Sequence, residues 1–409
     1  MVLVAKVGIK MEKRKLIRVT TSDISLESLI KGQLKFLSNE FEVVGVSNNT
    51  GMLQMIGERE GIRVIEVPMH REISLKDDVK CLWVLYRLFK RESPDIVHAN
   101  TPKGSLLSML AARCARVPHR IYTVTGLRYQ GAKGLFRDIL MGMERITCWA
   151  ATKVIPEGQG VLHTLQSDKI TKKSLSVIYH GNINGIDTEY FSREVTVKHL
   201  KQSVEFKEDI PTDVVRMRVR QSLGLADDDF GFIFIGRIVR GKGMHELASA
   251  MKKFSLENIH CKLILVGNFE EELDPLLSED MEFFTHDQSV KFVGYQNDVR
   301  PYLFAADALV FPSYREGFPN VVLQAGAMEL PSIVTDINGC NEIIEDNING
   351  IIIPSKDVEA LYMSMKYFME HIEKIKQMGI YSRPLICKRY EQQDVWHALS
   401  EEYRRVLSK

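Results

Sequence analysis

The sequence lacks a long uncharged hydrophobic run, a cysteine framework and any low-complexity tract. Every apolar stretch meets a charged residue before it reaches the ~18 residues that a membrane-spanning helix needs, so we expect no integral membrane segment. The six cysteines are scattered over 409 residues and include no Cys-x-x-Cys pair. A disulfide or zinc framework needs closer spacing, and we therefore expect reduced thiols and a cytoplasmic location.

Two further absences narrow the functional class. The opening segment Met1–Lys10 is too short for a secretory signal and is interrupted by Lys6, so we expect no export. The first expected strand, Lys15–Thr20, runs into a segment without glycine. A nicotinamide-dependent dehydrogenase would carry a Gly-x-Gly-x-x-Gly motif there, so that class is disfavoured.

The net charge of +1 conceals an uneven distribution of charge along the chain. Residues 1–190 hold 28 Lys+Arg against 19 Asp+Glu, and the remainder holds 26 against 34, so the two parts carry +9 and −8. A basic N-terminal half favours an anionic partner, such as a membrane surface or an acidic acceptor. The alternative is that the two halves neutralise each other across an interface. We expect no nucleic-acid partner.

What the sequence does contain is a regular alternation of short β-branched runs with amphipathic segments such as 25–37 and 77–90. A chain of this length is expected to form two domains. The alternation predicts an α/β fold with parallel sheets covered by helices, that is, two Rossmann-like, doubly wound domains facing a cleft. The expected strands are 15–20, 41–46, 63–67, 95–98, 120–124 and 175–179 in the first domain and 230–235, 262–266, 290–293, 308–311, 332–335 and 350–353 in the second.

The charged segment from Ser192 to Asp213 interrupts this pattern and is interpreted as a linker with a variable loop. We place the first domain at 1–190 and the second at 191–388. Doubly wound sheets bind ligands at the carboxyl ends of their strands. Asp227, Asp228 and Asp229 precede a strand, so we expect an exposed turn there and no metal.

The first chemical motif follows the expected strand 230–235 and reads Gly236-Arg237-Ile-Val-Arg-Gly-Lys242-Gly. Glycines let the backbone turn closely, and a forked guanidinium together with an ammonium suits a diphosphate. A solvated basic loop is the alternative for such a cluster. Its position directly after a strand favours a functional role.

The second motif, Glu316-Gly317-Phe318-Pro319-Asn320, lies between an expected strand and a helix. Backbone N–H groups from Gly317 to Asn320 would face an anion or a sugar hydroxyl, and Gln324 lies one turn beyond Asn320 on the same helix face. Glu316 could accept hydrogen bonds from sugar hydroxyls. Taken alone, it is more often a solvated turn residue.

These two motifs, together with Asn184-Gly185-Ile186-Asp187, closely resemble the retaining glycosyltransferase family 4, which has the GT-B fold. The resemblance extends from about Lys15 to Lys409. The segments Val97–Lys103, Thr123–Tyr129 and Val334–Gly339 are similar to the bacterial branch that extends lipid-linked oligosaccharides for capsule, O-antigen or glycoprotein glycans.

The resemblance implies a hexosyl- or N-acetylhexosaminyltransferase that uses a nucleoside-diphosphate sugar, expected to be UDP-linked, with no metal and no other cofactor. The acceptor would be a saccharide or a lipid-linked saccharide. Arg237 and Lys242 would neutralise the donor diphosphate and Glu316 would hold the transferred sugar, which makes them the expected catalytic residues. The expected donor-binding residues are Gly236, Gly317, Phe318, Pro319, Asn320, Gln324 and Asn184.

Two positions depart from the family pattern. Gln324 stands where the family usually has the glutamate that binds the ribose hydroxyls, and an uncharged amide makes weaker hydrogen bonds. Thr125 stands where many relatives have histidine, and threonine cannot titrate near neutrality. The expected acceptor-side residues are Lys103, Thr125, Arg128 and His98, although His98 reads equally as a structural histidine.

The resemblance also implies that the segment 389–409 is a terminal helix that crosses to the first domain, with Trp396 and Tyr403 as packing residues. Two basic and apolar segments, 82–91 and 131–141, suggest a peripheral association with the inner face of a membrane, and the second is the better candidate. A non-catalytic GT-B partner subunit and a GT-B sugar-nucleotide epimerase are the alternatives. A glycogen-type phosphorylase would need a pyridoxal lysine and a much longer chain.

Overall fold

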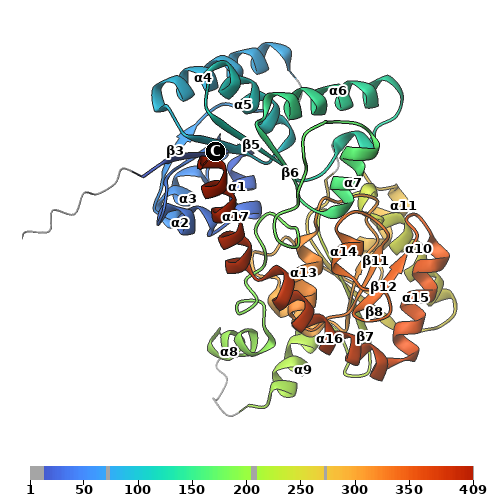
Figure 1. The fold of residues 1–409 in the computed structure, drawn as a ribbon. Helices are drawn as coiled ribbons and strands as arrows, with labels where there is room; N and C mark the ends of the chain where they lie inside the picture. Colours follow the sequence, from blue (N-terminus) through green and yellow to red (C-terminus); the bar gives the residue numbers. More distant parts are fainter. Residues whose placement is uncertain (1–12, 71–73, 204–209, 271–273, 409) are drawn as a thin grey trace, which may run out of the picture. The chain divides into compact units, whose positions relative to one another are not determined.

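The computed structural model describes residues 13–70, 74–203, 210–270 and 274–408 (Figure 1). The segment Met1–Lys10, in which we expect no export signal, lies outside the described residues. The chain divides into two compact units. The first contains the residues up to Pro156 together with Leu165–Ser176 and the chain from Trp396 onward, and the second contains Glu157–Thr164 and Val177–Val395. These divisions differ from the expected ones at 190 and 388, because residues 177–190 and 389–395 both belong to the second unit.

The first unit is built on a parallel six-stranded sheet with the order β3-β2-β1-β4-β5-β6. Val, Ile and Leu side chains of the central strands are fully buried, as expected for a sheet covered on both faces. The strands are β1 Lys15–Ser22, β2 Glu42–Asn48, β3 Arg63–Glu66, β4 Ile96–Ala99, β5 His119–Val124 and β6 Lys153–Pro156.

The expected strand Leu175–Tyr179 is wrong, since this segment has no regular structure. The sixth position of the sheet is taken by β6, which pairs with β5 in parallel so that Ile121 lies beside Lys153. The four-residue run Lys-Val-Ile-Pro is too short to be detected by periodicity, and its proline fits an edge strand.

Helices of the first unit pack on this sheet and on one another; α4 and α6 both pack against α5. The helix expected over 25–37 is divided at Gly32, where φ is +80° and a Cβ atom would lie 2.8 Å from the Trp396 ring. The helices are α1 Asp23–Ile30, α2 Gln33–Ser38, α3 Leu53–Glu60, α4 Leu75–Glu92, α5 Pro102–Cys114, the 3₁₀ turn η1 Arg128–Gly131, α6 Gly134–Ala150 and α7 Gln159–Ser167, the last of which extends from the second unit into the first.

The last helix, α17 Gln392–Leu407, contributes its C-terminal part to the first unit. Trp396 and Tyr403 are both buried, as expected for packing residues. The Trp396 ring lies 5.4 Å from that of Phe36, and the Tyr403 ring lies 5.7 Å from that of Phe41. The aromatic side chains of α17 therefore pack in the core of a unit whose strands lie much earlier in the sequence.

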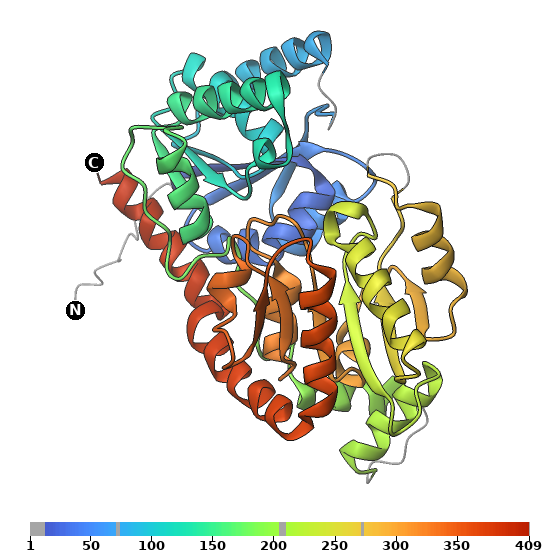
Figure 2. The ribbon, with the colours of Figure 1, turned by 90° about the vertical axis from the view of Figure 1, so that its right-hand side faces the viewer.

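The second unit repeats the architecture with the strand order β12-β11-β10-β7-β8-β9, again all parallel, and helices flank the strands (Figure 2). All six strands expected in this half are present: β7 Phe230–Ile235, β8 Cys261–Val266, β9 Val290–Gly294, β10 Ala308–Phe311, β11 Ser332–Thr335 and β12 Gly350–Ile353. The α/β class expected from the sequence is confirmed in both units.

The expectation of a linker over 192–213 is wrong in part, because Arg193–Ser203 forms helix α8. Its Thr196 is buried and lies against Met328 of the same unit. The remaining helices are α9 Thr212–Ser222, the 3₁₀ turn η2 Arg240–Lys242, α10 Met244–Leu256, α11 Ser278–His286, α12 Arg300–Ala305, α13 Asn320–Ala327, α14 Cys340–Ile343, α15 Val358–Glu370 and α16 Ile372–Tyr390.

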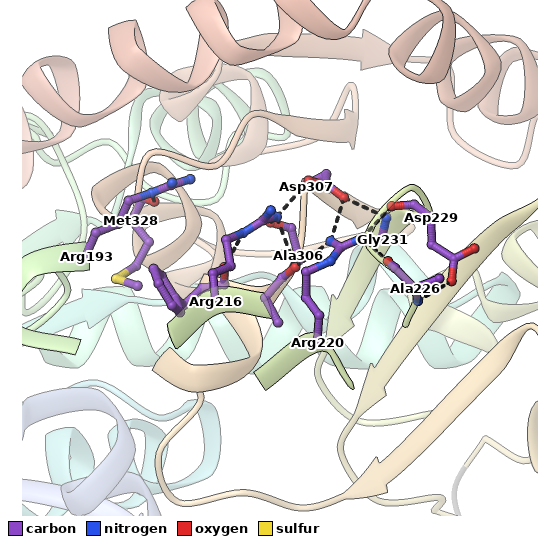
Figure 3. A network of polar contacts seen from close by, with 11 residues as sticks. Arg193, Arg216, Arg220, Ala226, Asp229, Gly231, Ala306, Asp307 and Met328 are labelled. Carbon is purple, nitrogen blue, oxygen red and sulfur yellow. Dashed lines mark hydrogen bonds and ion pairs between the residues drawn. The ribbon is translucent and has the colours of Figure 1, made fainter. Parts of the chain in front are cut away.

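A polar network fixes the amino end of β7 (Figure 3). The buried Arg220 guanidinium donates to Asp307 Oδ2 at 3.1 Å and to the carbonyl of Asp229. The same Asp307 oxygen accepts the Gly231 N–H at 2.8 Å, and Asp229 accepts the Ala226 N–H at 2.8 Å. Asp229 thus closes a turn, in keeping with the expected structural role of this acidic segment.

Two expectations about chain-wide features can also be compared with the structure. All six cysteines are free thiols, and four of them are buried. In the part of the chain that the structure describes, no helix has the length and the apolar character needed to cross a membrane.

Candidate functional site

The strand order of the second unit places a topological switch point between β7 and β10. These two strands are neighbours in the middle of the sheet, but the chain proceeds from β7 to β8 on one side and from β10 to β11 on the other. Ligands of doubly wound sheets bind outside the carboxyl ends of the strands at such a point. The two sequence motifs form the loops that follow these two strands.

The loop after β7 touches the loop after β10 directly. Gly243 has φ +73°, and a Cβ atom there would lie 2.0 Å from the Pro312 carbonyl oxygen, so only glycine fits. The Tyr314 N–H donates to the Gly241 carbonyl at 3.0 Å. Gly236, at the end of β7, also has positive φ, and its carbonyl oxygen lies where a Cβ atom of residue 267 would be. The glycines thus set the close approach of the loops.

Two of the three expected catalytic residues meet here. The Lys242 ammonium donates a hydrogen bond to Glu316 Oε1, and both side chains are mostly buried, at 16% and 17% exposed. Ser313 Oγ donates to the same oxygen at 2.7 Å, and the ammonium lies 5.2 Å from the centre of the Phe311 ring. The pair is therefore held in place by neighbours from the β10 loop.

Arg237 lies on the same loop but points elsewhere. Its side chain is exposed, and Nη1 lies 2.8 Å from Glu270 Oε2. Surface ion pairs of this kind contribute about 0–1 kcal/mol, so the guanidinium can exchange Glu270 for another anion at little cost. The structure thus leaves Arg237 accessible at the edge of the site, apart from the Lys242–Glu316 pair.

Two of the expected donor-binding residues, Asn184 and Asn320, are linked through Asn182, which the sequence motifs did not single out. Asn182 Nδ2 donates to Asn320 Oδ1 at 2.8 Å, while its Oδ1 accepts the N–H groups of Asn184 and Gly185 at 2.9 and 2.8 Å. Asn182 has φ +62°, which asparagine tolerates better than most residues. The buried Asn184 is therefore tied to the β10 loop by one amide.

The rest of the Glu316–Asn320 motif is packed tightly. Phe318 is buried with its ring 5.4 Å from that of Tyr390, and a Cβ atom on Gly339 would lie 2.6 Å from the Gly317 carbonyl oxygen. Pro319 is the residue that precedes α13, which begins at Asn320. The backbone of the motif is thus held in place by its packing against Tyr390 and Gly339 of the same unit.

Gln324 lies one turn into α13 and is half-buried. Among the residues that the structure describes, its amide has no hydrogen-bond partner. One turn separates it from Asn320, so both side chains lie at the start of the same helix face. A free amide at this position is available to hydroxyl groups of a ligand.

A buried carboxyl group, Glu157, lies near the same motif and was not anticipated. Burial raises its pKa to about 8, and the negative charges of Glu316 and Glu342 add to the rise, while the Ile183 N–H opposes it. Its carbonyl accepts the Asn182 N–H at 2.9 Å. Glu157 directly follows β6, which was not among the expected strands. A search for residues at the carboxyl ends of expected strands therefore could not find it.

His98 of the first unit does not face a ligand, which corrects the expected acceptor-side role. It is fully buried in β4, and its pKa is held well below the usual value by burial and by the Arg18 charge. Arg18 Nη1 lies 2.7 Å from Nδ1, the Tyr403 hydroxyl lies 2.6 Å from the same nitrogen, and Nε2 lies 2.7 Å from Thr123 Oγ1. An Arg donor requires Nδ1 to accept, so Nε2 carries the proton. The alternative of a structural histidine holds.

The other acceptor-side residues lie at the carboxyl edge of the first sheet, around its switch point between β1 and β4. Thr125 Oγ1 donates to the Asn100 carbonyl at 2.6 Å, Lys103 Nζ lies 2.6 Å from Asp78 Oδ1, and Arg128 is exposed on η1. Within the described ranges, neither side-chain atom of the fully buried Asn100 has a hydrogen-bond partner. A buried amide without a partner is uncommon in folded proteins, and the sequence did not reveal this one at the switch point.

The two segments suggested for membrane contact differ in exposure. On α4, Leu85 and Phe89 are buried and Trp83 is exposed, so this helix is partly committed to the core. On α6, Leu135 and Phe136 are both exposed, and several more apolar side chains of the helix join them: Ile139, Ile146 and Trp149. Within the two segments themselves, Leu135, Phe136 and Ile139 are exposed in the second and Trp83 and Val84 in the first, and membrane association stays a prediction.

A group of possible metal ligands lies on α10 and α11. His245, Glu279 and Asp280 place one ligand atom each within 4.8 Å of one another. The Asp280 carboxylate already accepts from His245 at 2.8 Å and lies 3.5 Å from the Lys252 ammonium. A neighbouring cation opposes metal binding there, and the expected independence of the activity from metal stays a prediction.

Two family models match the chain, one in each half. The model of the group 1 glycosyl transferases matches residues 215–384, and the model described as glycosyl transferase 4-like matches residues 25–157. The first match includes both loops of the switch point in the second unit.

Named relatives match over most of their length. The capsular polysaccharide biosynthesis glycosyltransferase CapM of Staphylococcus aureus is 28% identical over 98% of this chain and 99% of its own. The UDP-Gal:α-D-GlcNAc-diphosphoundecaprenol α-1,3-galactosyltransferase of Escherichia coli is 27% identical over 84% of this chain and 86% of its own.

The fold also matches solved structures. The crystal structure of Anabaena Alr3699/HepE in complex with UDP and glucose superimposes with a TM-score of 0.77 at 18% identity, covering 96% of this chain and all of that one. At this identity the match concerns the fold alone, and it agrees with the two doubly wound units described above.

Proposed function

Because the chain belongs to the group 1, 4-like glycosyl transferases and has the GT-B fold, we propose that it transfers a sugar from a UDP-linked donor to a lipid-linked saccharide with retention of anomeric configuration. The chain is a hexosyl- or N-acetylhexosaminyltransferase of polysaccharide biosynthesis. The donor base, the acceptor and the stereochemical course are the proposed part.

The observation that carries the proposal is the Lys242–Glu316 pair at the switch point of the second unit. A mostly buried ammonium beside a glycine-rich loop suits the diphosphate of a nucleotide sugar, and the exposed guanidinium of Arg237 can reach a second phosphate. Glu316, oriented by Ser313 and Lys242, has a second carboxylate oxygen for sugar hydroxyls. The site therefore combines a cationic and an anionic group for the two parts of a nucleotide sugar.

In the proposed reaction, the acceptor hydroxyl attacks the anomeric carbon on the face that the diphosphate leaves. The bond from the anomeric carbon to the diphosphate oxygen breaks as the new glycosidic bond forms. The hydroxyl proton passes to a phosphate oxygen of the leaving group. Lys242 and Arg237 stabilise the charge that develops on this group, so the protein acts through position and electrostatics.

The ribose would lie against α13. Gln324 carries a half-buried amide that can donate to one hydroxyl and accept from another, one turn from Asn320. The Escherichia coli relative is named for a UDP-linked donor, which supports uridine as the base.

The lipid-linked acceptor is supported by the same relative, whose named acceptor is a diphosphoundecaprenol-linked sugar. The first unit carries the basic half of the chain and the exposed apolar side chains of α6. A basic and apolar surface favours contact with an anionic membrane, where such a lipid resides.

The test is a transfer assay with purified protein, a panel of UDP-, GDP- and dTDP-sugars, and a lipid diphosphate saccharide. We expect product only with the UDP sugar, an unchanged anomeric configuration by NMR, and full activity in a chelator. A sugar epimerised without acceptor would support the epimerase alternative, and the absence of turnover with every pair would support a non-catalytic subunit.

A further inference from the structure

A cavity lies inside the first unit, between α4, α5, η1 and α6. Its empty volume is about 540 Å³, part of which is open to solvent. The space that the centre of a water-sized sphere can reach is only about 40 Å³, so the enclosed part fits a short hydrocarbon segment and a longer ligand would extend through the opening. The cavity is separate from the Lys242–Glu316 site, because it belongs entirely to the other unit.

Most of the cavity wall is hydrocarbon. Leu106 and Leu107 contribute from α5, and Leu140 and Met143 contribute from α6. Leu107 and Leu140 are buried, whereas Leu106 and Met143 are partly exposed toward the opening. A saccharide would need several polar groups aimed at its hydroxyls, so this wall fits an apolar chain better.

Charged groups border the hydrocarbon wall. Lys103 is paired with Asp78 at 2.6 Å, and Arg128 is an exposed cation on η1. Glu144 faces the cavity from α6; burial raises its pKa to about 7, and the Tyr122 hydroxyl, which donates to it at 2.7 Å, opposes the rise. Two cations and two carboxyl groups therefore line the cavity, and burial keeps the Glu144 carboxyl protonated to a higher pH than usual. The balance favours an anion beside the apolar wall.

The cations lie at the edge where a substrate is expected. Lys103 follows the carboxyl end of β4, and Arg128 follows that of β5, its neighbour in the sheet. Ligands of doubly wound sheets bind at this edge. Helix α6, which forms one wall of the cavity, also presents Leu135 and Phe136 to solvent at its N-terminal end. The exposed apolar residues and one wall of the cavity therefore belong to the same helix.

We propose that this cavity binds the first part of the hydrocarbon chain of a phosphorylated polyprenyl lipid, with the phosphate beside Arg128 and Lys103. The inference rests on the proposed function, because it assigns to the lipid part of the acceptor a binding site in the protein. The membrane then supplies the lipid, and the cavity binds the part of its hydrocarbon chain that lies next to the phosphate. Acceptors that share a saccharide and differ in their hydrocarbon are distinguished by this site.

The direct test uses the whole chain and two probes, farnesyl diphosphate and inorganic diphosphate, in calorimetric titrations. We expect farnesyl diphosphate to bind at least about tenfold more tightly, because only it places hydrocarbon in the cavity. Equal affinity of the two probes would overturn the proposal. This measurement does not depend on transfer activity, so it separates a failure of the cavity from a failure of the proposed function.

The matched variants are Leu106→Trp and Leu110→Trp. Both leucines lie on α5 and are partly exposed, one turn apart, but only Leu106 lines the cavity. We expect Leu106→Trp to reduce farnesyl diphosphate affinity about tenfold and to leave inorganic diphosphate unaffected, while Leu110→Trp changes neither. The same loss in both variants, or no loss in Leu106→Trp with an unchanged melting temperature, would refute the cavity as the site.

The kinetic test compares one saccharide diphosphate attached either to a long polyprenyl chain or to a short alkyl chain. Leu106→Trp should raise KM about tenfold for the polyprenyl acceptor and by less than about twofold for the short one, with kcat unchanged. Arg128→Gln should raise KM for both, since both carry the diphosphate. An equal rise with both acceptors in Leu106→Trp would indicate a general defect and contradict the proposal.

Discussion

Lys242 and Glu316 are 74 positions apart in the chain, and their side chains form a mostly buried ion pair. The glycine-rich loop after β7 brings the ammonium to the carboxylate, and Ser313 holds the same carboxylate oxygen. Removal of one member leaves the other with an uncompensated charge, which costs more than the pair itself contributes. The stability of the two loops therefore depends on the presence of both charges of the pair.

Arg237→Ala and Lys242→Ala should each lower kcat/KM by about 10² or more, because both cations stabilise charge on the departing diphosphate. Arg240→Ala is the matched control: it removes an exposed arginine of the same loop and should keep nearly full activity. Steady-state rates with saturating acceptor, together with melting temperatures, provide the measurement. Near-normal turnover in both test variants would show that Arg237 and Lys242 do not stabilise the diphosphate.

Gln324→Glu should keep or improve the affinity for UDP, since a carboxylate accepts two hydroxyl hydrogen bonds more strongly than an amide does. Gln324→Leu should weaken it. The same two changes at Gln288, which is exposed in the loop before β9, serve as controls and should have no effect. Calorimetric titration with UDP distinguishes these outcomes, and indifference to both changes at Gln324 would place the ribose elsewhere.

Glu157 should make the protein less stable as the pH rises from about 4.5 to 8. Its pKa is raised to about 8 in the folded protein against 4.5 for an ordinary glutamate, so the folded state holds the proton longer than the unfolded state does. The contribution is present below 4.5 and is lost as the pH rises through the folded value. Glu316 and Glu342 face this group, and Lys242 already compensates the former.

Glu157→Gln should remove this dependence, because the amide has no proton to lose. Relative to the original protein, the variant should gain several degrees of melting temperature at pH 8 compared with pH 5, since about 1 kcal/mol shifts Tm by ~2–4 °C in a domain of 150–250 residues. Thermal melts of both proteins at the two pH values measure the difference. An identical pH dependence would show that Glu157 is charged when folded.

Binding to anionic vesicles should be sensitive to salt and should depend on the start of α6. The double change Lys133→Glu and Arg137→Glu should weaken binding strongly, because each basic residue near such a surface contributes about 1 kcal/mol. The change of Leu135 and Phe136 to Ser tests the apolar part, with Leu256 of α10, which is at least as exposed as either, changed to Ser as its control. Co-sedimentation that none of these changes affects would leave the basic half to be explained by neutralisation between the two units.

Strands were predictable where four to six residues included at least three of Val, Ile, Leu, Phe or Thr. All six strands of the second unit meet this condition. β6 does not, since Lys153 and Pro156 leave only two apolar β-branched residues between them, while Leu175–Tyr179 satisfies the pattern but finds no place in the sheet. The tertiary fold decides which segment pairs with a given strand, and the hydrophobic periodicity of the sequence carries no information on this pairing.

The site residues that were predictable are those in loops directly after expected strands. Lys242 and Glu316 lie on loops after adjacent strands, so the rule of the switch point brings them together. Glu157 and Asn182 enter the site through segments that only the folded unit brings close. His98 failed for a further reason: a residue near a strand end can face the core, and the Arg18 and Tyr403 partners that hold it there come from the far ends of the sequence.

The contribution of α17 to the first unit bears on the order in which the protein is made. Arg18 and Gly32 leave the ribosome long before Tyr403 and Trp396, which contact them. Domains usually fold as units while the chain emerges. Here the first unit must wait for the whole second unit before its core is complete. A nascent chain that stalls before Trp396 therefore carries a finished C-terminal sheet and an N-terminal one with an open groove, which exposes the earlier-made half to chaperones and proteases for longer.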